Sequence, residues 1–204
     1  MGLKPYLGPA LAVLLVCTAC STRAQTVHAA TQSKFPLAVG AGFSGYNTDV
    51  GNGDMYGGTL WIDYTLRHMP HYLIGLGLEA EGRDLNYGNH PSTWTNLRMD
   101  VASGGVIYTL PRFAKFRPYG KYLMGFGNID YGAPLYPTHA TRTVTSMGGG
   151  VDYRIFRNVW ARADYEYQFW PDFWKLNGAA HGASLTPEGF TIGAMYHFGH
   201  PGSR

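Results

Sequence analysis

The stretch VWARADYEYQFW, residues 159–170, alternates apolar and polar side chains along almost its whole length. Its odd positions carry Val, Ala, Tyr and Phe, whereas Arg162, Asp164, Glu166 and Gln168 occupy even positions. Because successive side chains of a strand point to opposite faces, one face is apolar and the other is charged. The stretch is longer than the usual soluble strand of about 5–6 residues and fits a membrane-crossing strand of roughly 9–11 residues. By itself it also fits a soluble antiparallel sheet.

Residues 1–24 have the pattern of an export signal, with a lysine near the start and a largely apolar run over residues 7–16. Small residues at positions 22 and 24 suit a signal peptidase, so we expect cleavage after Ala24. Cleavage near residues 29–30 is an alternative, and lipid attachment at Cys20 is a rival. The apolar run is too short for a spanning helix of about 20 residues.

Composition favours an all-β chain. The sequence holds 28 glycines in 204 residues, which is roughly double the average usage of about 7%. Its only cysteines, Cys17 and Cys20, precede the expected cleavage site, which excludes disulfides and thiolate chemistry from the mature chain. The net charge of +3 is small and scattered, which argues against nucleic acid as a partner. No apolar run after the signal approaches about 18 residues, so helices do not place the chain in a membrane.

Alternating segments repeat along the chain, and they predict an eight-stranded antiparallel up-and-down transmembrane β-barrel over residues 35–198. We expect a short periplasmic segment, residues 25–34, before the barrel and a C-terminal extension, residues 199–204, after it. Connections after the second, fourth and sixth segments are predicted to be short turns, and the others longer external loops. The expected strands are residues 35–46, 55–67, 72–84, 94–110, 119–131, 141–155, 159–170 and 187–198.

Two segments depart from simple alternation. The fourth begins with Leu97, Met99 and Val101 on the expected lipid face and Arg98 and Asp100 on the other. Its phase then blurs around residues 103–105, where we expect a β-bulge. The fifth segment is the least regular, and residues 111–118 before it, rich in Arg and Lys, are predicted to form a turn.

The polar face of these strands should line the barrel interior. An eight-stranded barrel is just wide enough for its own side chains, so we expect ion pairs across a plugged lumen. Glycines such as Gly75, Gly77, Gly148 and Gly150 should make room for the larger side chains opposite. The expected lumen network consists of Asp63, Arg67, Glu79, Glu81, Arg83, Arg98, Asp100, Lys121, Asp152, Arg154, Arg162, Asp164 and Glu166.

The signal, the alternating strands and the closing Tyr196-His197-Phe198 resemble the small outer-membrane β-barrel family of the OmpA transmembrane-domain type. The resemblance implies a protein of the bacterial outer membrane, without a cofactor, in contact with outer-membrane lipid and lipopolysaccharide. It also implies recognition of Phe198 by the barrel assembly machinery, a monomer, and a surface ligand held by the external loops. Aromatic residues near the strand ends fit two interfacial belts. A soluble barrel such as a lipocalin is the alternative.

The histidines do not form a convincing metal site. His68 and His71 flank a proline without a neighbouring carboxylate or cysteine. His90, His139 and His181 fall in three expected external loops, where histidines are usually solvated. We therefore expect no metal site.

Catalysis is weakly supported. No Gly-x-Ser-x-Gly motif occurs, and the pairing of Ser92 or Ser184 with a loop histidine would be a coincidence. His197 should face the lumen as a hydrogen-bonded residue. The expected function is a structural, envelope-integrity or surface-interaction role and not an enzyme activity. The alternatives are a lipid-modifying acyl hydrolase or transferase and a narrow pore for small solutes.

Overall fold

A computed structural model describes residues 36–48, 53–66, 69–70, 73–87, 98–130, 139–171 and 184–198. The chain divides into two compact units, residues 1–33 and 34–204, and all described residues belong to the second unit. The expected signal, the expected periplasmic segment and the C-terminal extension lie outside the described residues. In the part of the chain that is described, no helix is long and apolar enough to cross a membrane.

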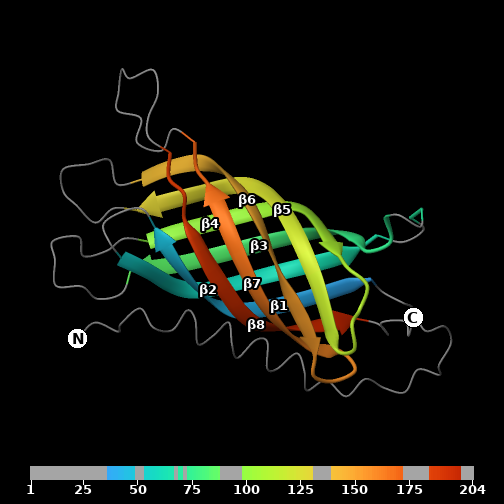
Figure 1. The fold of residues 1–204 in the computed structure, drawn as a ribbon. Helices are drawn as coiled ribbons and strands as arrows, with labels where there is room; N and C mark the ends of the chain where they lie inside the picture. Colours follow the sequence, from blue (N-terminus) through green and yellow to red (C-terminus); the bar gives the residue numbers. More distant parts are fainter. Residues whose placement is uncertain are drawn as a thin grey trace, which may run out of the picture. The chain divides into compact units, whose positions relative to one another are not determined.

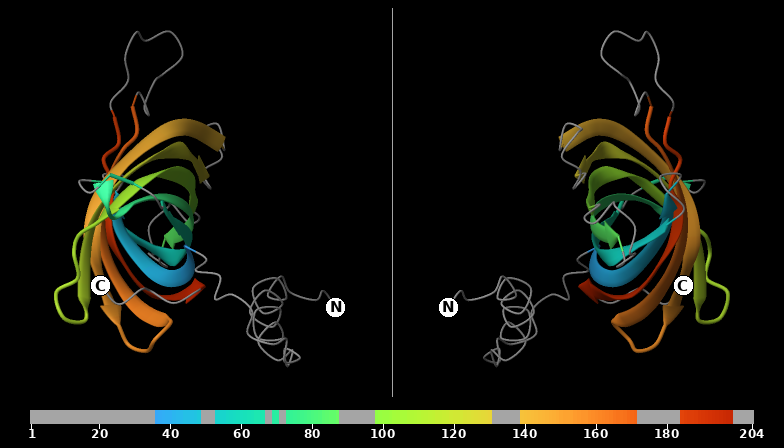
Figure 2. Two further views of the ribbon diagram at one scale, coloured as in Figure 1. Left: turned by 90° about the vertical axis from the view of Figure 1, so that its right-hand side faces the viewer. Right: turned by 90° about the vertical axis from the view of Figure 1, so that its left-hand side faces the viewer.

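Eight antiparallel strands pair in sequence order, and β1 also pairs with β8, so the sheet closes into a barrel (Figure 1). Seen from its end, the ring of strands surrounds one interior (Figure 2). This confirms the predicted eight-stranded up-and-down barrel. The strands are β1 (Leu37–Thr48), β2 (Gly53–Thr65), β3 (Leu76–Tyr87), β4 (Arg98–Thr109), β5 (Phe116–Asp130), β6 (His139–Arg154), β7 (Val159–Phe169) and β8 (Glu188–Phe198).

The outer face of the barrel is apolar. On β7, Arg162 and Glu166 are each only 2% exposed inside the barrel, whereas Tyr165 is 55% exposed on the outside. The alternation predicted for this strand is therefore confirmed. Large apolar side chains are exposed all round the barrel, and so broad an apolar surface suits lipid and not water. They include Phe43, Leu60, Ile62, Leu78, Val106, Met124, Phe126, Met147, Phe169, Phe190 and Ile192.

The predicted facing of β4 was wrong at its start. Met99 and Val101 are buried inside the barrel, and Arg98 and Asp100 lie outside. The pairing of β4 with β3 and β5 runs without interruption through residues 103–105, so the expected bulge is absent there. The physical reason is that the interior at this end of the barrel is apolar, so apolar side chains of β4 turn inward.

Strand β5 is regular, contrary to expectation. Leu123 is fully buried inside, whereas Met124 and Phe126 are exposed outside, as a single alternation requires. The strand also begins at Phe116, so the last residues of the expected turn belong to the sheet. The sequence pattern was misleading because Leu123 is an apolar residue on the lumen face.

The barrel has two ends, which we call the terminal rim and the loop rim. The terminal rim holds the start of β1, the end of β8 and the β2–β3, β4–β5 and β6–β7 connections; the loop rim holds the other four connections. The β4–β5 and β6–β7 connections, residues 110–115 and 155–158, are short as predicted. The β1–β2 connection, residues 49–52, is shorter than the β2–β3 connection, residues 66–75, so strict alternation of lengths was wrong.

The late start of β3 explains this difference. The strand begins at Leu76 and not at Tyr72 as expected. Pro70 cannot donate to a ladder, and Gly75 has a φ of 107°, a left-handed conformation that favours glycine. A Cβ atom at Gly75 would also lie 2.1 Å from the carbonyl oxygen of Thr109. Gly75 therefore turns the chain into β3 and does not make room in the lumen.

Eight strands place both ends of the barrel on the same side of the membrane. Because we expect a periplasmic segment before the first strand, we predict that the loop rim faces the cell exterior. We expect an Asn52→Cys variant to react with a membrane-impermeant maleimide on intact cells, and an Arg157→Cys variant to react only after permeabilisation. The mature chain expected after cleavage has no other cysteine, so labelling reports these positions alone. Equal labelling of both variants on intact cells would contradict this orientation.

The apolar outer face predicts a cost for burying charge in it. Ala163 is exposed in the middle of β7, between Val151 of β6 and Ile192 of β8. We expect Ala163→Arg to lower the free energy of unfolding in lipid by about 2–4 kcal/mol at the midplane. Thr141→Arg, near the start of β6 at the loop rim, is the control and should cost about 0–1 kcal/mol. Equal denaturation midpoints for the two variants would contradict a lipid-facing Ala163.

Candidate functional site in the barrel interior

Four carboxylates surround the ammonium group of Lys121 in the middle of the barrel. Its Nζ atom lies 2.6 Å from Asp164 Oδ2, 2.8 Å from Glu81 Oε2, 2.9 Å from Glu166 Oε2 and 3.2 Å from Glu79 Oε1. An ammonium group has three N–H donors, and Glu79 Oε1 has no hydrogen-bond partner among the described residues, so this fourth contact is an ion pair without a hydrogen bond. The carboxylates come from β3 and β7, which lie opposite each other in the ring. Lys121 of β5 therefore bridges opposite walls of the barrel.

Arg83 forms a second bridge between the same walls. Its Nη1 atom donates to Glu166 Oε1 at 3.0 Å, and its Nη2 atom donates to Glu81 Oε1 at 2.5 Å. Its Nε atom donates to Thr59 Oγ1 at 3.1 Å, and its guanidinium carbon lies 4.3 Å from the centre of the Tyr46 ring. All five N–H directions of a guanidinium are fixed in one plane, so these contacts determine the orientation of Arg83.

Arg162 binds three carboxylates, of which Asp63 and Asp152 are new and Glu79 is shared with Lys121. Its Nη2 atom donates to Asp63 Oδ2 at 2.7 Å, its Nη1 atom to Glu79 Oε2 at 2.9 Å, and its Nε atom to Asp152 Oδ1 at 2.9 Å. Glu79 thus contacts both Arg162 and Lys121. The two cationic centres are therefore joined through a shared carboxylate into one continuous network.

The network continues towards the terminal rim through Arg117. This guanidinium donates through Nη2 to Asp152 Oδ2 at 2.7 Å and lies 4.7 Å from the centre of the Trp160 ring. His197 is also at this end, with its Nε2 atom 3.5 Å from Arg117 Nη2 and its ring at 5.3 Å from Trp160. Cation–π contact at these distances stabilises a desolvated guanidinium.

The buried network has more acidic than basic groups. Burying a charge costs several kcal/mol unless it is paired, so shared contacts such as those of Lys121 and Glu79 are required. One oxygen each of Asp63 and Asp164 is buried without a hydrogen-bond partner among the described residues. The carboxylates are Asp63, Glu79, Glu81, Asp152, Asp164 and Glu166, and the cations are Arg83, Arg117, Lys121 and Arg162.

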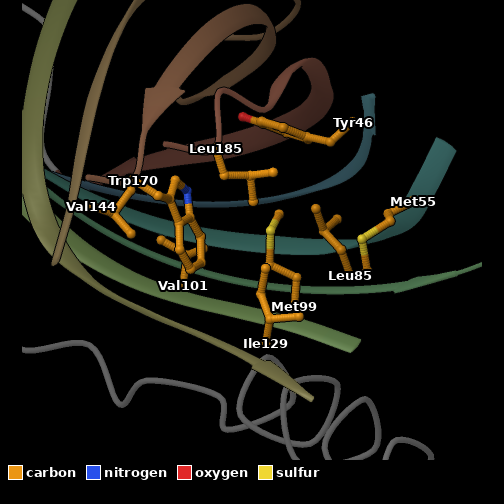
Figure 3. Packing of buried hydrophobic residues seen from close by; sticks show 9 residues of the cluster. All are labelled: Tyr46, Met55, Leu85, Met99, Val101, Ile129, Val144, Trp170 and Leu185. Carbon is orange, nitrogen blue, oxygen red and sulfur yellow. The ribbon is translucent and has the colours of Figure 1, made fainter. Parts of the chain in front are cut away.

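A cluster of buried apolar side chains lies in the interior at the loop rim. Its side chains converge from facing walls of the barrel and from the β7–β8 connection, which contributes Leu185 (Figure 3). Trp170 Nε1 donates to Gln168 Oε1 at 3.0 Å, and Gln168 Nε2 donates to Glu166 Oε1 at 2.9 Å, which links this cluster to the ions. The members of this loop-rim cluster are Tyr46, Met55, Leu85, Met99, Val101, Ile129, Val144, Trp170 and Leu185.

Glycines allow large rings to enter the lumen. A Cβ atom at Gly40 would lie 2.3 Å from the Trp61 ring, and one at Gly127 would lie 2.1 Å from the Trp170 ring. Trp61 belongs to a second apolar cluster, with Ala38, Trp160 and Met195, nearer the terminal rim. Of the glycines expected to make room for side chains, Gly148 and Gly150 first meet backbone oxygens of β7 instead.

The structure separates the expected lumen residues into groups. Arg98 and Asp100 pair with each other at 3.2 Å on the outside, where the Arg98 side chain is 51% exposed, so their predicted place in the lumen was wrong. Arg154 lies at the terminal rim without a carboxylate partner among the described residues, and Arg67 lies outside those residues. Buried inside the barrel are Asp63, Glu79, Glu81, Arg83, Lys121, Asp152, Arg162, Asp164 and Glu166.

Three participants were missed by the analysis of the sequence. Arg117 was assigned to a turn. It lies two and four residues before Tyr119 and Lys121, so in a strand all three share one face, and this pattern could have placed Arg117 in the lumen. Gln168 was placed only on the polar face of its strand, and Ser44 was not among the expected lumen residues. Ser44 Oγ lies 2.5 Å from Thr59 Oγ1 and so ties β1 to β2.

The structure adds little about the histidines considered as metal ligands and about the assembly signal. Over the described ranges, no group of three or more His, Cys, Asp and Glu side chains is placed to hold a metal ion. His68, His71, His90 and His181 lie outside those ranges. Phe198 ends β8 on the outer face, with its ring 5.0 Å from that of Tyr196, and its role as an assembly signal stays a prediction.

Solved structures of other proteins have the same architecture. Neisserial surface protein A matches with a TM-score of 0.60 and 16% identity, over 81% of this chain and 98% of that chain. Ail, the attachment invasion locus protein of Yersinia pestis, matches with a TM-score of 0.54 and 16% identity, over 81% of this chain and 99% of that chain. At such identities, the similarity shows the fold alone. No curated protein sequence matches this chain.

A match to a sequence family identifies the protein more closely than the shared fold does. The model of the family described as "Outer membrane protein beta-barrel domain" matches residues 12–198, which is most of the chain. The apolar outer face and the closed antiparallel sheet agree with that match. The chain therefore belongs to the outer membrane protein beta-barrel domain family and is a protein of the bacterial outer membrane.

Proposed function

We propose that this protein is a sealed barrel with a structural or surface-interaction role in the outer membrane, and neither a pore nor an enzyme. One observation carries the proposal: Lys121 and Arg83 join carboxylates of β3 and β7, on opposite walls, in the middle of the lumen. A solute that crosses the barrel would have to displace these contacts.

The arrangement of the interior supports closure along the barrel axis. The network extends from Arg117 near the terminal rim to Gln168, where the apolar cluster of the loop rim begins. Ions are disfavoured in the apolar cluster because it cannot replace their hydration shells. The lumen thus has two successive barriers of different chemistry, an ionic one and an apolar one.

A sealed, rigid barrel leaves its connections as the surfaces available for contact with other molecules. The longest of these is the β7–β8 connection at the loop rim, residues 170–187. Ail, which has the same fold, has also been solved in complex with the heparin analogue sucrose octasulfate. The charges described at the loop rim of this chain favour a basic partner instead, since the carboxylates outnumber the guanidiniums. They are Asp54, Asp84, Asp100, Asp130 and Glu188 against Arg98 and Arg142.

Sealing predicts a negligible conductance. In planar bilayers, the wild-type protein should show no large, steady open state. Lys121→Met removes the cation that bridges the two walls, so we expect it to produce frequent conducting events. Arg98→Met removes a cation from the outside of the barrel and should leave the recordings unchanged. A large, steady conductance of the wild type would show that the lumen is a water-filled pore.

The same pair of variants tests the energetics of the network. Lys121→Met leaves four buried carboxylates without their common cation and should lower the free energy of unfolding by about 3–5 kcal/mol. Water that enters the lumen would reduce this figure. Arg98→Met breaks the two exposed pairs with Asp84 and Asp100 and should cost about 1 kcal/mol or less. Denaturant titrations in lipid vesicles measure both, and similar midpoints would mean that Lys121 is solvated and not part of a plug.

A further inference from the structure

Basic side chains gather at the terminal rim. They lie in the β4–β5 and β6–β7 connections and in the adjoining ends of β5 and β6: Arg112, Lys115, Arg117, Arg154 and Arg157. Within the described ranges, the carboxylates nearest to this rim, Asp63 and Asp152, are buried: Asp63 binds Arg162, and Asp152 binds Arg162 and Arg117. The other four basic side chains have no carboxylate partner among the described residues. The described carboxylates outside the lumen all lie at the loop rim, so no exposed acid of those ranges offsets these charges.

Backbone hydrogen bonds hold the two connections together. The N–H groups of Phe113 and Phe116 each donate to the other residue's carbonyl oxygen at 2.9 Å, which makes the β4–β5 connection a tight hairpin. The N–H of Arg154 donates to the carbonyl oxygen of Lys115 at 3.0 Å, which ties the end of β6 to this hairpin. The two connections lie at the same end of the barrel (Figure 1). Their charges are therefore presented on a fixed surface.

The guanidinium groups of this surface are crowded and incompletely paired. Arg112 lies 5.0 Å from the centre of the Trp160 ring, on which Arg117 also packs, at 4.7 Å. The Nε atom of Arg112 is buried without a hydrogen-bond partner among the described residues. Desolvation and the nearby charges of Arg154 and Arg117 lower the pKa of Arg112. A bound anion would relieve the repulsion among these guanidinium groups.

Exposed apolar side chains flank the same charges. Phe113 is 80% exposed, Phe156 is 69% exposed and Ile155 is 47% exposed, and all three lie on the two basic connections. Aromatic side chains favour the headgroup level of a membrane, and basic clusters beside a membrane attract anionic lipids. A polyanion dissolved in water would account for the arginines but not for the exposed rings.

We propose that the terminal rim of β5–β7 is a binding site for the phosphate headgroups of anionic phospholipids in the adjacent leaflet. Arg112, Arg154 and Arg157 would contact the phosphate, while Phe113 and Phe156 lie at the level of the headgroups and upper acyl chains. The site adjoins the end of the lumen network, because Arg112 packs on the same Trp160 ring as Arg117. It shares no residue with the Lys121 and Arg83 contacts on which the proposed sealing rests.

Native mass spectrometry of the folded, detergent-solubilised protein tests this site through titration with phosphatidylglycerol or phosphatidylcholine. We expect the wild type to bind phosphatidylglycerol more tightly than phosphatidylcholine. A basic residue beside an anionic lipid surface contributes about fivefold in affinity. The variant R112Q/R154Q/R157Q should therefore bind phosphatidylglycerol at least about tenfold more weakly, with unchanged binding of phosphatidylcholine. Arg142→Gln at the loop rim is the matched control and should bind like the wild type.

A second variant shows whether weaker binding results from lost contacts or from loss of folding. Folding of each variant is checked by the heat-dependent gel mobility of the barrel. K115Q/R157Q alters only exposed side chains and should weaken phosphatidylglycerol binding by about fivefold or more. Competition with inorganic phosphate alone should require a large excess, because phosphate lacks the acyl chains that the rings contact. Equal affinity of the wild type for the two lipids, retention of full affinity by both variants, or equally effective competition by free phosphate would overturn the proposal.

Discussion

The pairing of β1 with β8 is the constraint on which the rest of the structure depends. Lipid offers no hydrogen bonds, so every backbone group in the membrane must be bonded within the sheet, which therefore has to close. Closure runs from Leu37 opposite Phe198 to Asn47 opposite Glu188. With eight strands, the enclosed space is only wide enough for side chains, so each inward residue must pack against or pair with another inward residue.

The interior satisfies this requirement in two chemically different ways. At the loop rim, residues such as Met99 and Leu185 pack against each other without any charge. In the middle, Lys121, Arg83 and Arg162 pair with buried carboxylates instead. Because buried ion pairs often add little net stability over apolar packing, filling the lumen does not by itself explain them. What they add is directional contact between β3 and β7, which are not neighbours in the sheet, and this fixes the positions of the opposite walls relative to each other.

The sequence best predicted which side chains point into the lumen and which point to lipid in strands whose two faces differ in chemistry. On β7, charged and apolar residues alternate, and the structure has the predicted facing. On β4, Met99 and Arg98 were assigned to the wrong sides because an apolar residue was equated with lipid contact. That rule fails at the loop rim, where the interior is apolar and exposed Arg98 pairs with Asp84. Alternation shows which residues of a strand share a face. It does not show how deep in the membrane a residue lies, and therefore not whether the interior beside it is apolar or charged.

The partners of the buried charges depend on information that no single strand contains. Lys121 meets Glu81 and Asp164 only because β3, β5 and β7 have particular registers around the closed ring.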